Sequence, residues 1–333
     1  MPGPPTTLEG LKSICGSGTV AYPFVVCLTK IGGFHTQLWY EKASGHSTKR
    51  SNLRAHGWST EHPYAEAVAI RAGITKDFIQ HLPANDRQYY GVDSKLEPNG
   101  FLVDAGLRKV QENLPEPTKE QLLEGGRAAV QYNHSPGITS WLDPLADESV
   151  LETYRRLAEH GELTAHVVAF PQVLARKPAE ELANVQKLRE KFKSIPNLSV
   201  TGVKIFADGV VEYPSQTAAM TKPYCNSGKN GELLFEPARF AELVIAAKQG
   251  LIVLVHALGD VAVKESLNGI ERARRANGSS GLPHTLTHVQ FADPADIPRF
   301  QELGVVVALQ LLWASAGEDT IGLVKPYLEL SLS

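Results

Sequence analysis

The sequence has little of what several protein classes require. Three cysteines in 333 residues (Cys15, Cys27 and Cys225) are too few and too scattered for a disulfide framework or a cysteine-based zinc site. No apolar run approaches the roughly 18–20 residues of a membrane span. The net charge of −3 gives no basic field for nucleic acid. The N-terminus, MPGPPTTLEG, lacks the basic start and apolar core of a signal peptide. We therefore expect a soluble, cytoplasmic protein without nucleic-acid or membrane partners.

What is present is typical of a globular chain, with 43% hydrophobic and 21% charged residues. Residues 1–118 form an irregular N-terminal segment, in which 20–28 (VAYPFVVCL) favours a strand and 61–74 has helical spacing. A regular domain is expected over 119–333, and Thr118 is placed to cap its first helix.

The regular domain alternates amphipathic helices with short apolar, β-branched runs. The predicted helices span 119–133, 148–160, 178–193, 236–249, 260–277 and 294–303. Each precedes a predicted strand, at 137–142, 163–170, 198–207, 251–257, 284–289 and 305–310 respectively. This alternation predicts an α/β fold with a parallel sheet. No Gly-rich phosphate loop follows a strand, which favours a (β/α) barrel over a nucleotide-binding doubly wound sheet.

Barrel enzymes carry their chemistry at the carboxyl ends of the strands. The polar residues at these positions are Asp143, Lys204, Asp208, His256, His288 and Gln310. His256 and His288 each close an apolar run on successive strands, and neutral imidazole is the commonest zinc ligand. Adjacent strands lie about 4.8 Å apart, so two such rings can converge on one ion. The alternative is that both are ordinary buried histidines bonded to the backbone.

Lys204 lies between Val203 and Ile205 on a predicted buried strand. Burial disfavours the charged ammonium, and a neutral amine can react with CO2 to form an anionic carbamate that binds metal. Alternatively, the ammonium reaches the barrel mouth or pairs with Asp208.

Other candidates have weaker patterns. His46 is expected in a surface loop, His284 at the opposite end of its strand, and Asp260 as a helix cap. No G-x-S-x-G elbow or suggestive Cys–His spacing supports a nucleophilic serine or cysteine.

Four motifs together resemble the amidohydrolase superfamily, and most closely its amidohydrolase-3 branch. They are GVKIFADGVVEYPSQTAAM (202–220), VHALGD (255–260), LTHVQ (286–290) and RFQELGVVVALQ (299–310). Their order and spacing match over roughly residues 95–313, and EHPYAEAVAIRAGIT (61–75) is similar to a further segment of that branch.

The resemblance implies a metal-dependent hydrolase on a (β/α)8 TIM-type barrel, acting on a small-molecule substrate. It implies that Lys204, often carboxylated in the superfamily, and His256 and His288 are catalytic residues that hold a divalent metal, expected to be zinc. It also implies a substrate contact for His62, and Asp208 is our second candidate for substrate binding.

The sequence departs from the family pattern in two places. It contains no H-x-H pair, since GGFHTQ (32–37) retains only His35, and no Ser-Asp pair follows the last predicted strand. The recognisable strands correspond to strands two to seven, which implies an incomplete barrel from a chain truncated at both ends. Its open edges favour association into a homo-oligomer, unless 20–28 and 323–330 cover them.

Two functions follow from this pattern. The first is a metal-dependent hydrolase that cleaves a C–N bond, in an amide or an N-substituted formamide, with a metal-activated water. The second is a degenerate, non-catalytic family member or truncated product that acts, if at all, as a binding protein.

Overall fold

The computed structural model of the chain describes residues 72–83, 86–102, 106, 109–110, 117–278, 281–310, 317 and 321–329. The predictions for the strand at 20–28 and for His35, His46 and His62 lie outside these residues, as does most of the predicted helix at 61–74. The boundary at 118 between an irregular segment and a barrel domain stays a prediction.

The regular part of the chain is a parallel α/β fold, as the alternating pattern predicts. Its strands are β3 (Ser140–Asp143), β4 (His166–Ala169), β5 (Leu198–Val200), β6 (Gly202–Phe206), β7 (Ile252–Ala257), β8 (Thr285–His288) and β9 (Val306–Ala308). They pair in the orders β3-β4-β5 and β6-β7-β8-β9, and every one of these pairings is parallel.

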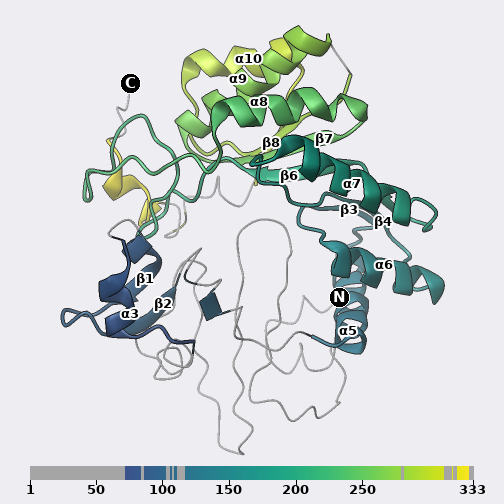
Figure 1. The fold of residues 1–333 in the computed structure, drawn as a ribbon, viewed down its shortest axis with the longest axis horizontal. Helices are drawn as coiled ribbons and strands as arrows, with labels where there is room; N and C mark the ends of the chain where they lie inside the picture. The colour runs from purple at the N-terminus through teal and green to yellow at the C-terminus, as the bar shows by residue number, and fades with distance from the viewer. Residues whose placement is uncertain are drawn as a thin grey trace, which may run out of the picture.

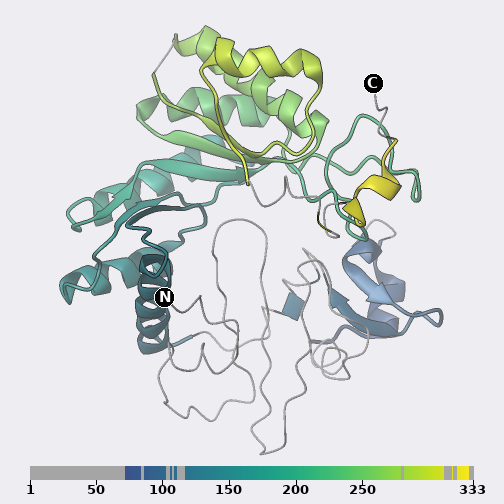
Figure 2. The ribbon, with the colours of Figure 1, turned by 180° about the vertical axis from the view of Figure 1, so that it is seen from behind.

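Helices connect these strands at the predicted positions. They are α5 (Lys119–His134), α6 (Glu148–Glu159), α7 (Pro178–Phe192), α8 (Pro237–Ala246), α9 (Asp260–Asn277) and α10 (Ile297–Leu303). The helices lie along the outer, convex side of the strands, so that the two layers form an arc (Figure 1), and the view from behind shows the same layering (Figure 2).

Hydrogen bonds join the two parallel sheets into one continuous arrangement. Only Thr201 separates β5 from β6, and the residues after β4 extend along β6. The Lys204 amide donates to the Pro171 carbonyl (2.9 Å), and the Val173 amide donates to the Lys204 carbonyl (2.8 Å). The predicted strand 198–207 is therefore interrupted once, while the sheet runs on through it.

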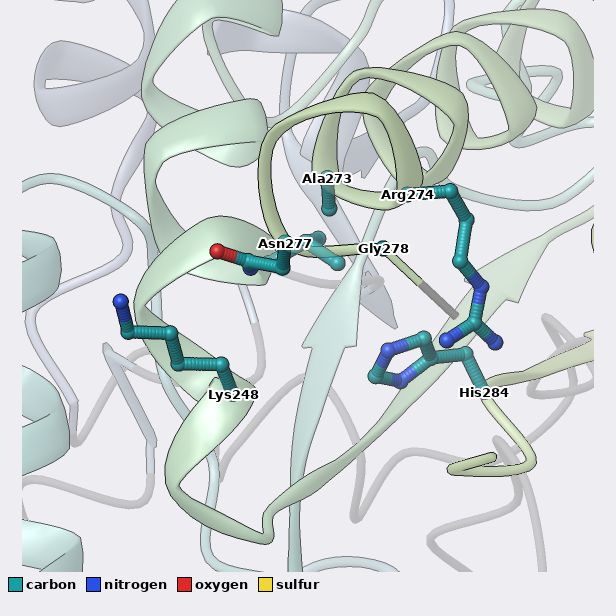
Figure 3. Close-up of a pocket in the computed structure, with 7 residues that line it drawn as sticks. Lys248, Ala273, Arg274, Asn277, Gly278 and His284 are labelled. Carbon is teal, nitrogen blue, oxygen red and sulfur yellow. The ribbon is translucent and has the colours of Figure 1, made fainter. Parts of the chain in front are cut away.

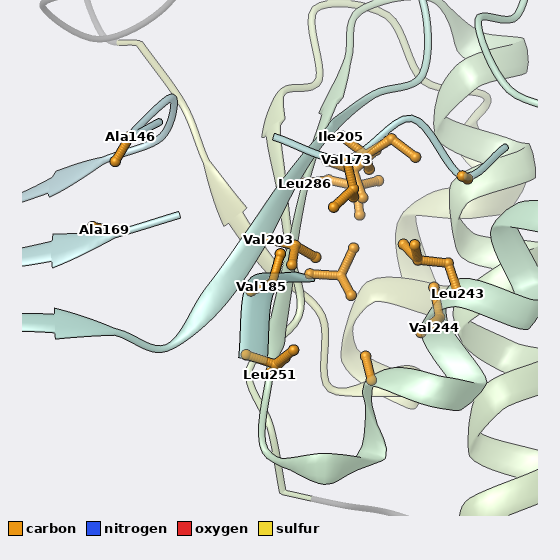
Figure 4. Close-up of a cluster of buried hydrophobic side chains, with 14 of the residues drawn as sticks. Ala146, Ala169, Val173, Val185, Val203, Ile205, Leu243, Val244, Leu251 and Leu286 are labelled. Carbon is orange, nitrogen blue, oxygen red and sulfur yellow. The ribbon is translucent and has the colours of Figure 1, made fainter. Parts of the chain in front are cut away.

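The hydrophobic core lies between the strands and the outer helices. Val203 and Ile205 are 0% and 1% exposed and belong to one cluster with Leu243 of α8 and Leu286 of β8 (Figure 4). Because side chains alternate across a strand, Lys204 points to the opposite face, away from these helices.

Two helix starts show how the sequence places these elements. At α5 the Thr118 hydroxyl accepts the Gln121 amide and the Gln121 side chain accepts the Thr118 amide, which confirms the predicted cap as a reciprocal capping box. The expectation for Asp260 is wrong. Gly259 is the N-cap of α9, and the Asp260 carboxylate instead accepts the Thr221 amide at 2.8 Å.

The sequence analysis missed a small unit before α5. Helix α3 (Lys76–His81) packs beside the antiparallel pair β1 (Tyr90–Val92) and β2 (Pro98–Leu102) around a separate apolar cluster that includes Ile79 and Tyr90. Strands of three and five residues give little periodicity to recognise.

The C-terminal segment does not extend the sheet. Lys325–Tyr327 is a 3₁₀ turn, and it packs on the long loop after β6, where the Tyr213 amide donates to the Leu323 carbonyl (2.8 Å). The rings of Tyr213 and Tyr327 stack with centroids 4.7 Å apart. The expectation that 323–330 covers a sheet edge is therefore wrong for the described part of that segment, in which Pro326 lies inside the turn.

Candidate metal centre

The structure brings the two predicted histidines together. Parallel pairing sets Phe206 of β6 beside His256 and sets Ala257 of β7 beside His288. The imidazole centroids of His256 and His288 are 4.6 Å apart with an interplanar angle of 67°. Both side chains are buried, at 0% and 5% exposed. The carboxyl ends of β7 and β8 therefore carry a close pair of imidazoles.

Each imidazole is held by an oxygen that fixes its tautomer. Nε2 of His256 lies 2.8 Å from the Gly209 carbonyl, which can only accept, so Nε2 carries the proton and the lone pair is on Nδ1. Nδ1 of His288 donates to Oε1 of Gln310 (2.7 Å), which leaves the lone pair on Nε2. A protonated nitrogen held by a carbonyl oxygen is the usual arrangement around a metal-binding histidine.

The backbone is strained where β8 ends. His288 and Val289 have φ values of 77° and 45°. A positive φ is a genuine outlier for a β-branched residue such as valine, and such strain tends to gather at functional sites. The Val289 amide donates to the Ala257 carbonyl at 2.9 Å, which holds this turn against the end of β7.

Lys204 lies beside the histidine pair and is 4% exposed. Its amine is 3.4 Å from the Thr287 hydroxyl and 4.7 Å from the centroid of the Phe206 ring. Burial lowers the pKa of Lys204 to about 7, while the nearby Asp208 opposes the shift. A fraction of this amine is therefore neutral near pH 7.

Asp208 is fully buried, and both of its carboxylate oxygens accept backbone amides. Oδ1 accepts from Leu258 (3.0 Å), and Oδ2 accepts from Gly259 (2.8 Å) and Ala219 (3.0 Å). Burial raises the pKa of Asp208 to about 7, although these three N–H donors oppose the shift. The carboxyl group thus ties the loop after β6 to the loop after β7. This arrangement favours a positioning role, and the role of Asp208 in substrate binding stays a prediction.

The electrostatics keep the two imidazoles neutral. Burial lowers the pKa of His256 well below its ordinary value, and His288 and Lys204 lower it further. Burial also lowers the pKa of His288 to about 4, with a smaller contribution from Lys204. Neutral imidazole is the form that binds metal ions.

The remaining strand-end residues have different surroundings. Asp143 accepts the Tyr154 hydroxyl (2.9 Å) and lies on β3, which belongs to the other group of parallel strands, β3-β4-β5. His284 lies at the amino end of β8, in a pocket with Arg274 and Lys248 (Figure 3), and its Nδ1 accepts the Val253 amide at 3.1 Å. It is therefore remote from the carboxyl-end site, as its place before the strand predicts.

The sequence analysis singled out Gln310 as a strand-end residue but missed its contact with His288. It also missed Thr287, which precedes His288 on the same strand. The signal available for Gln310 was its place after the neighbouring apolar run. His62 lies outside the described residues.

Within the part of the chain that the structure describes, no three His, Cys, Asp or Glu residues gather closely enough to hold a metal ion. Lys204 is a described residue beside the pair whose neutral amine can react with CO2 to form an anionic carbamate. No helix among the described residues is long and apolar enough to cross a bilayer.

Residues 63–326 match the sequence model of the Amidohydrolase family, and the chain belongs to that family. Among its relatives is the exoenzymes regulatory protein AepA of Pectobacterium carotovorum subsp. carotovorum, with 27% identity over 67% of this chain and 48% of that protein. Another is the putative amidohydrolase YtcJ of Bacillus subtilis, with 27% identity over 73% of this chain and 44% of that protein. The chain thus spans less than half the length of both relatives.

Two solved structures share the fold. They are uncharacterized metal-dependent hydrolases from Pyrococcus horikoshii and Pyrococcus furiosus, with TM-scores of 0.55 and 0.56 and identities of 22% and 23%. Each likeness covers 74% of this chain, against 47% and 49% of the respective neighbour.

Proposed function

We propose that this chain is a metal-dependent hydrolase that cleaves a C–N bond, in an amide or an N-substituted formamide, with a metal-activated water. The observation that supports this most is the pair of neutral imidazoles at the ends of β7 and β8, each held at one nitrogen by a carbonyl oxygen. Membership of the Amidohydrolase family supports the same chemistry.

The donor set fits a divalent ion, for which we propose zinc. His256 and His288 contribute two neutral nitrogens, and catalytic zinc takes about three protein ligands with one open position. Lys204 would supply the third ligand as a carbamate, formed when its neutral amine reacts with CO2. The anionic carbamate also balances charge, which two neutral imidazoles do not.

The residues of this chain have separable tasks in the proposed reaction. A bound divalent metal supplies Lewis acidity, which polarises a substrate carbonyl and lowers the pKa of water toward about 7. Gly209 and Gln310 hold the protons of the two histidines, so each ring keeps its tautomer. Asp208 fixes the loops that carry Gly209 and follow His256. We propose His62 as a further substrate contact.

We further propose that the parallel sheet is a sector of a (β/α)8 barrel. Six successive helix–strand repeats with outer helices support this architecture. In such a barrel the carboxyl ends of the strands surround one mouth, which would place substrate over the histidine pair.

Metal content tests the proposal directly. The purified chain, supplemented with zinc and bicarbonate, should contain close to stoichiometric metal by mass spectrometry. His288→Ala should lose metal while keeping its cooperative unfolding, because its role at the mouth is ligation. His160→Ala, at an exposed position on the C-cap of α6, is the matched control and should keep metal. Metal-free wild-type protein under these conditions would refute the proposal.

Lys204 gives a second test. Lys204→Ala should abolish metal binding, and short carboxylic acids should partly restore it by replacing the carbamate. Metal binding by Lys204→Ala without added acid would show that this lysine is not a ligand.

The lack of an H-x-H pair in the sequence favours a second candidate, a degenerate, non-catalytic family member that acts as a binding protein. If the chain is such a binding protein, Lys204→Met should have the same metal content as wild type. Its free energy of unfolding should be at least as high, because the substitution removes a buried amine.

A further inference from the structure

Glu212 is a buried carboxylate with little to neutralise it. It lies on the long loop after β6 and is 8% exposed. Among the residues that the structure describes, its side chain accepts one long hydrogen bond, from Nε2 of Gln290 to Oε1 of Glu212 at 3.5 Å. Across the described ranges, no lysine, arginine or histidine forms an ion pair with Glu212.

Gln290 presents a second acceptor at the same place. Its Oε1 is buried and has no hydrogen-bond partner within the described part of the chain. Turning the amide over would not help, because Oε1 would then face the Glu212 carboxylate, acceptor against acceptor. In the observed orientation, carboxylate oxygens of Glu212 and the amide oxygen of Gln290 therefore remain available to accept hydrogen bonds from a ligand.

The pair lies at the carboxyl edge of the sheet, where the candidate metal centre is. Gln290 comes two residues after His288, and the next amide, Phe291, donates to the Leu258 carbonyl at 2.9 Å. Glu212 follows Asp208 by four residues on the loop that Asp208 ties to the end of β7. The same loops thus carry the two acceptors and position His256.

A buried carboxylate and a buried amide oxygen without donors are both costly. A group that satisfies both at once needs positive charge and several N–H bonds. A primary ammonium has three donors and no acceptor, so it can donate to the carboxylate and to the amide oxygen together.

We propose that Glu212 and Gln290 bind a primary ammonium group of the substrate. This inference deepens the proposed hydrolase function and rests on it for the identification of the ligand as substrate. It assigns the substrate class as amides that carry an amino group, with the ammonium seated at Glu212 and the scissile carbonyl at the histidine pair.

Calorimetric titration of the purified full chain tests the site without any turnover. Three probes of similar size separate the contributions: n-butylammonium has charge and N–H donors, tetramethylammonium has charge alone, and n-butanol has neither. We expect n-butylammonium to bind wild type more tightly than either other probe. Glu212→Gln should weaken n-butylammonium binding about tenfold or more, because a charged partner is lost from a buried pair. Equal affinity for wild type and Glu212→Gln, or no binding to wild type, would overturn the proposal.

Two further variants guard against a trivial loss of structure. Glu302→Gln, at an exposed position on α10, is the matched control and should bind n-butylammonium as wild type does. Gln290→Leu should weaken n-butylammonium binding while leaving Glu212 in place.

Thermal unfolding without probe gives an independent test. Glu212→Gln should melt at or above the wild-type midpoint, because it removes an uncompensated buried charge. A lower midpoint would show that the free protein already stabilises this carboxylate, and would overturn the proposal.

Metal analysis of the same samples separates this inference from the proposed function. If the protein contains metal but does not bind n-butylammonium, the ammonium site alone is refuted. Metal-free protein that binds n-butylammonium through Glu212 supports the ammonium site and refutes the hydrolase proposal.

Discussion

Acid should destabilise this protein through His284, a histidine remote from the candidate metal centre. The side chain is 3% exposed, and its Nδ1 accepts the Val253 amide at 3.1 Å. Burial, together with a smaller effect of the neighbouring Arg274 guanidinium, lowers the pKa of His284 from 6.5 to about 4. Protonation would place an N–H opposite the Val253 amide, so the folded state holds the neutral ring.

The direction and size of this acid destabilisation follow from the linkage between proton binding and unfolding. Because the pKa of His284 is lower in the folded state, the unfolded chain binds the extra proton first as the pH falls. Stability is therefore complete above pH 6.5 and is lost as the pH falls toward 4. At pH 5 the loss from this group is about 2 kcal/mol, and below pH 4 it approaches about 3 kcal/mol.

The perturbation is His284→Gln, which keeps an acceptor for the Val253 amide but does not titrate. Urea unfolding at pH 7 and pH 5 gives the free energy of unfolding for each protein. The difference between the two pH values should be smaller in the variant by about 2 kcal/mol. His160→Gln, on the surface, should keep the wild-type difference. An unchanged difference in His284→Gln would refute the argument that this imidazole is held neutral.

Three further substitutions test the packing around the site. Leu286→Ala removes a 0% exposed core side chain and should cost about 2–5 kcal/mol in denaturant unfolding; a cost below about 1 kcal/mol would contradict the packing described. Gly259→Ala would place a Cβ 2.0 Å from the Ala219 carbonyl oxygen, so it should lower the melting midpoint, and an unchanged midpoint would show that these loops are not in close contact. Asp208→Ala leaves three backbone amides without their acceptor and should cost about 3 kcal/mol or more by urea unfolding; near-wild-type stability would show that the loops hold together without the carboxylate.

The helix–strand alternation could be predicted because each element has a periodicity of its own. Amphipathic helices and β-branched runs are local patterns, and all six repeats appear in the structure at the predicted places. The pair His256 and His288 could be predicted for the same reason, since parallel strands bring their carboxyl ends to one edge.

The contacts of Asp208 could not be predicted, because its partners are set by tertiary structure. Ala219 lies in a long irregular loop, and Leu258 and Gly259 lie beyond the next helix and strand. Glu212 and Gln290 meet in the same way, from loops that are distant in sequence. No local sequence pattern predicts that a carboxylate will join two loops through hydrogen bonds.

The order of the strands has a consequence for local unfolding of the sheet. Within each of the two groups, β3 to β5 and β6 to β9, every strand pairs with the next one along the chain, so assembly uses contacts that are short-range for a β-sheet. Such a sheet can grow from its middle outward and lose its ends first. Val253 on β7 and Leu286 on β8, the inner strands of the four-stranded sheet, are 0% exposed, whereas Leu142 on β3 and Val306 on β9 are 41% and 47% exposed. Amide hydrogen exchange should therefore be slowest in β7 and β8 and fastest in β3 and β9. The histidine pair lies on the slowest-exchanging strands, so local fraying at either end of the sheet would leave its geometry intact.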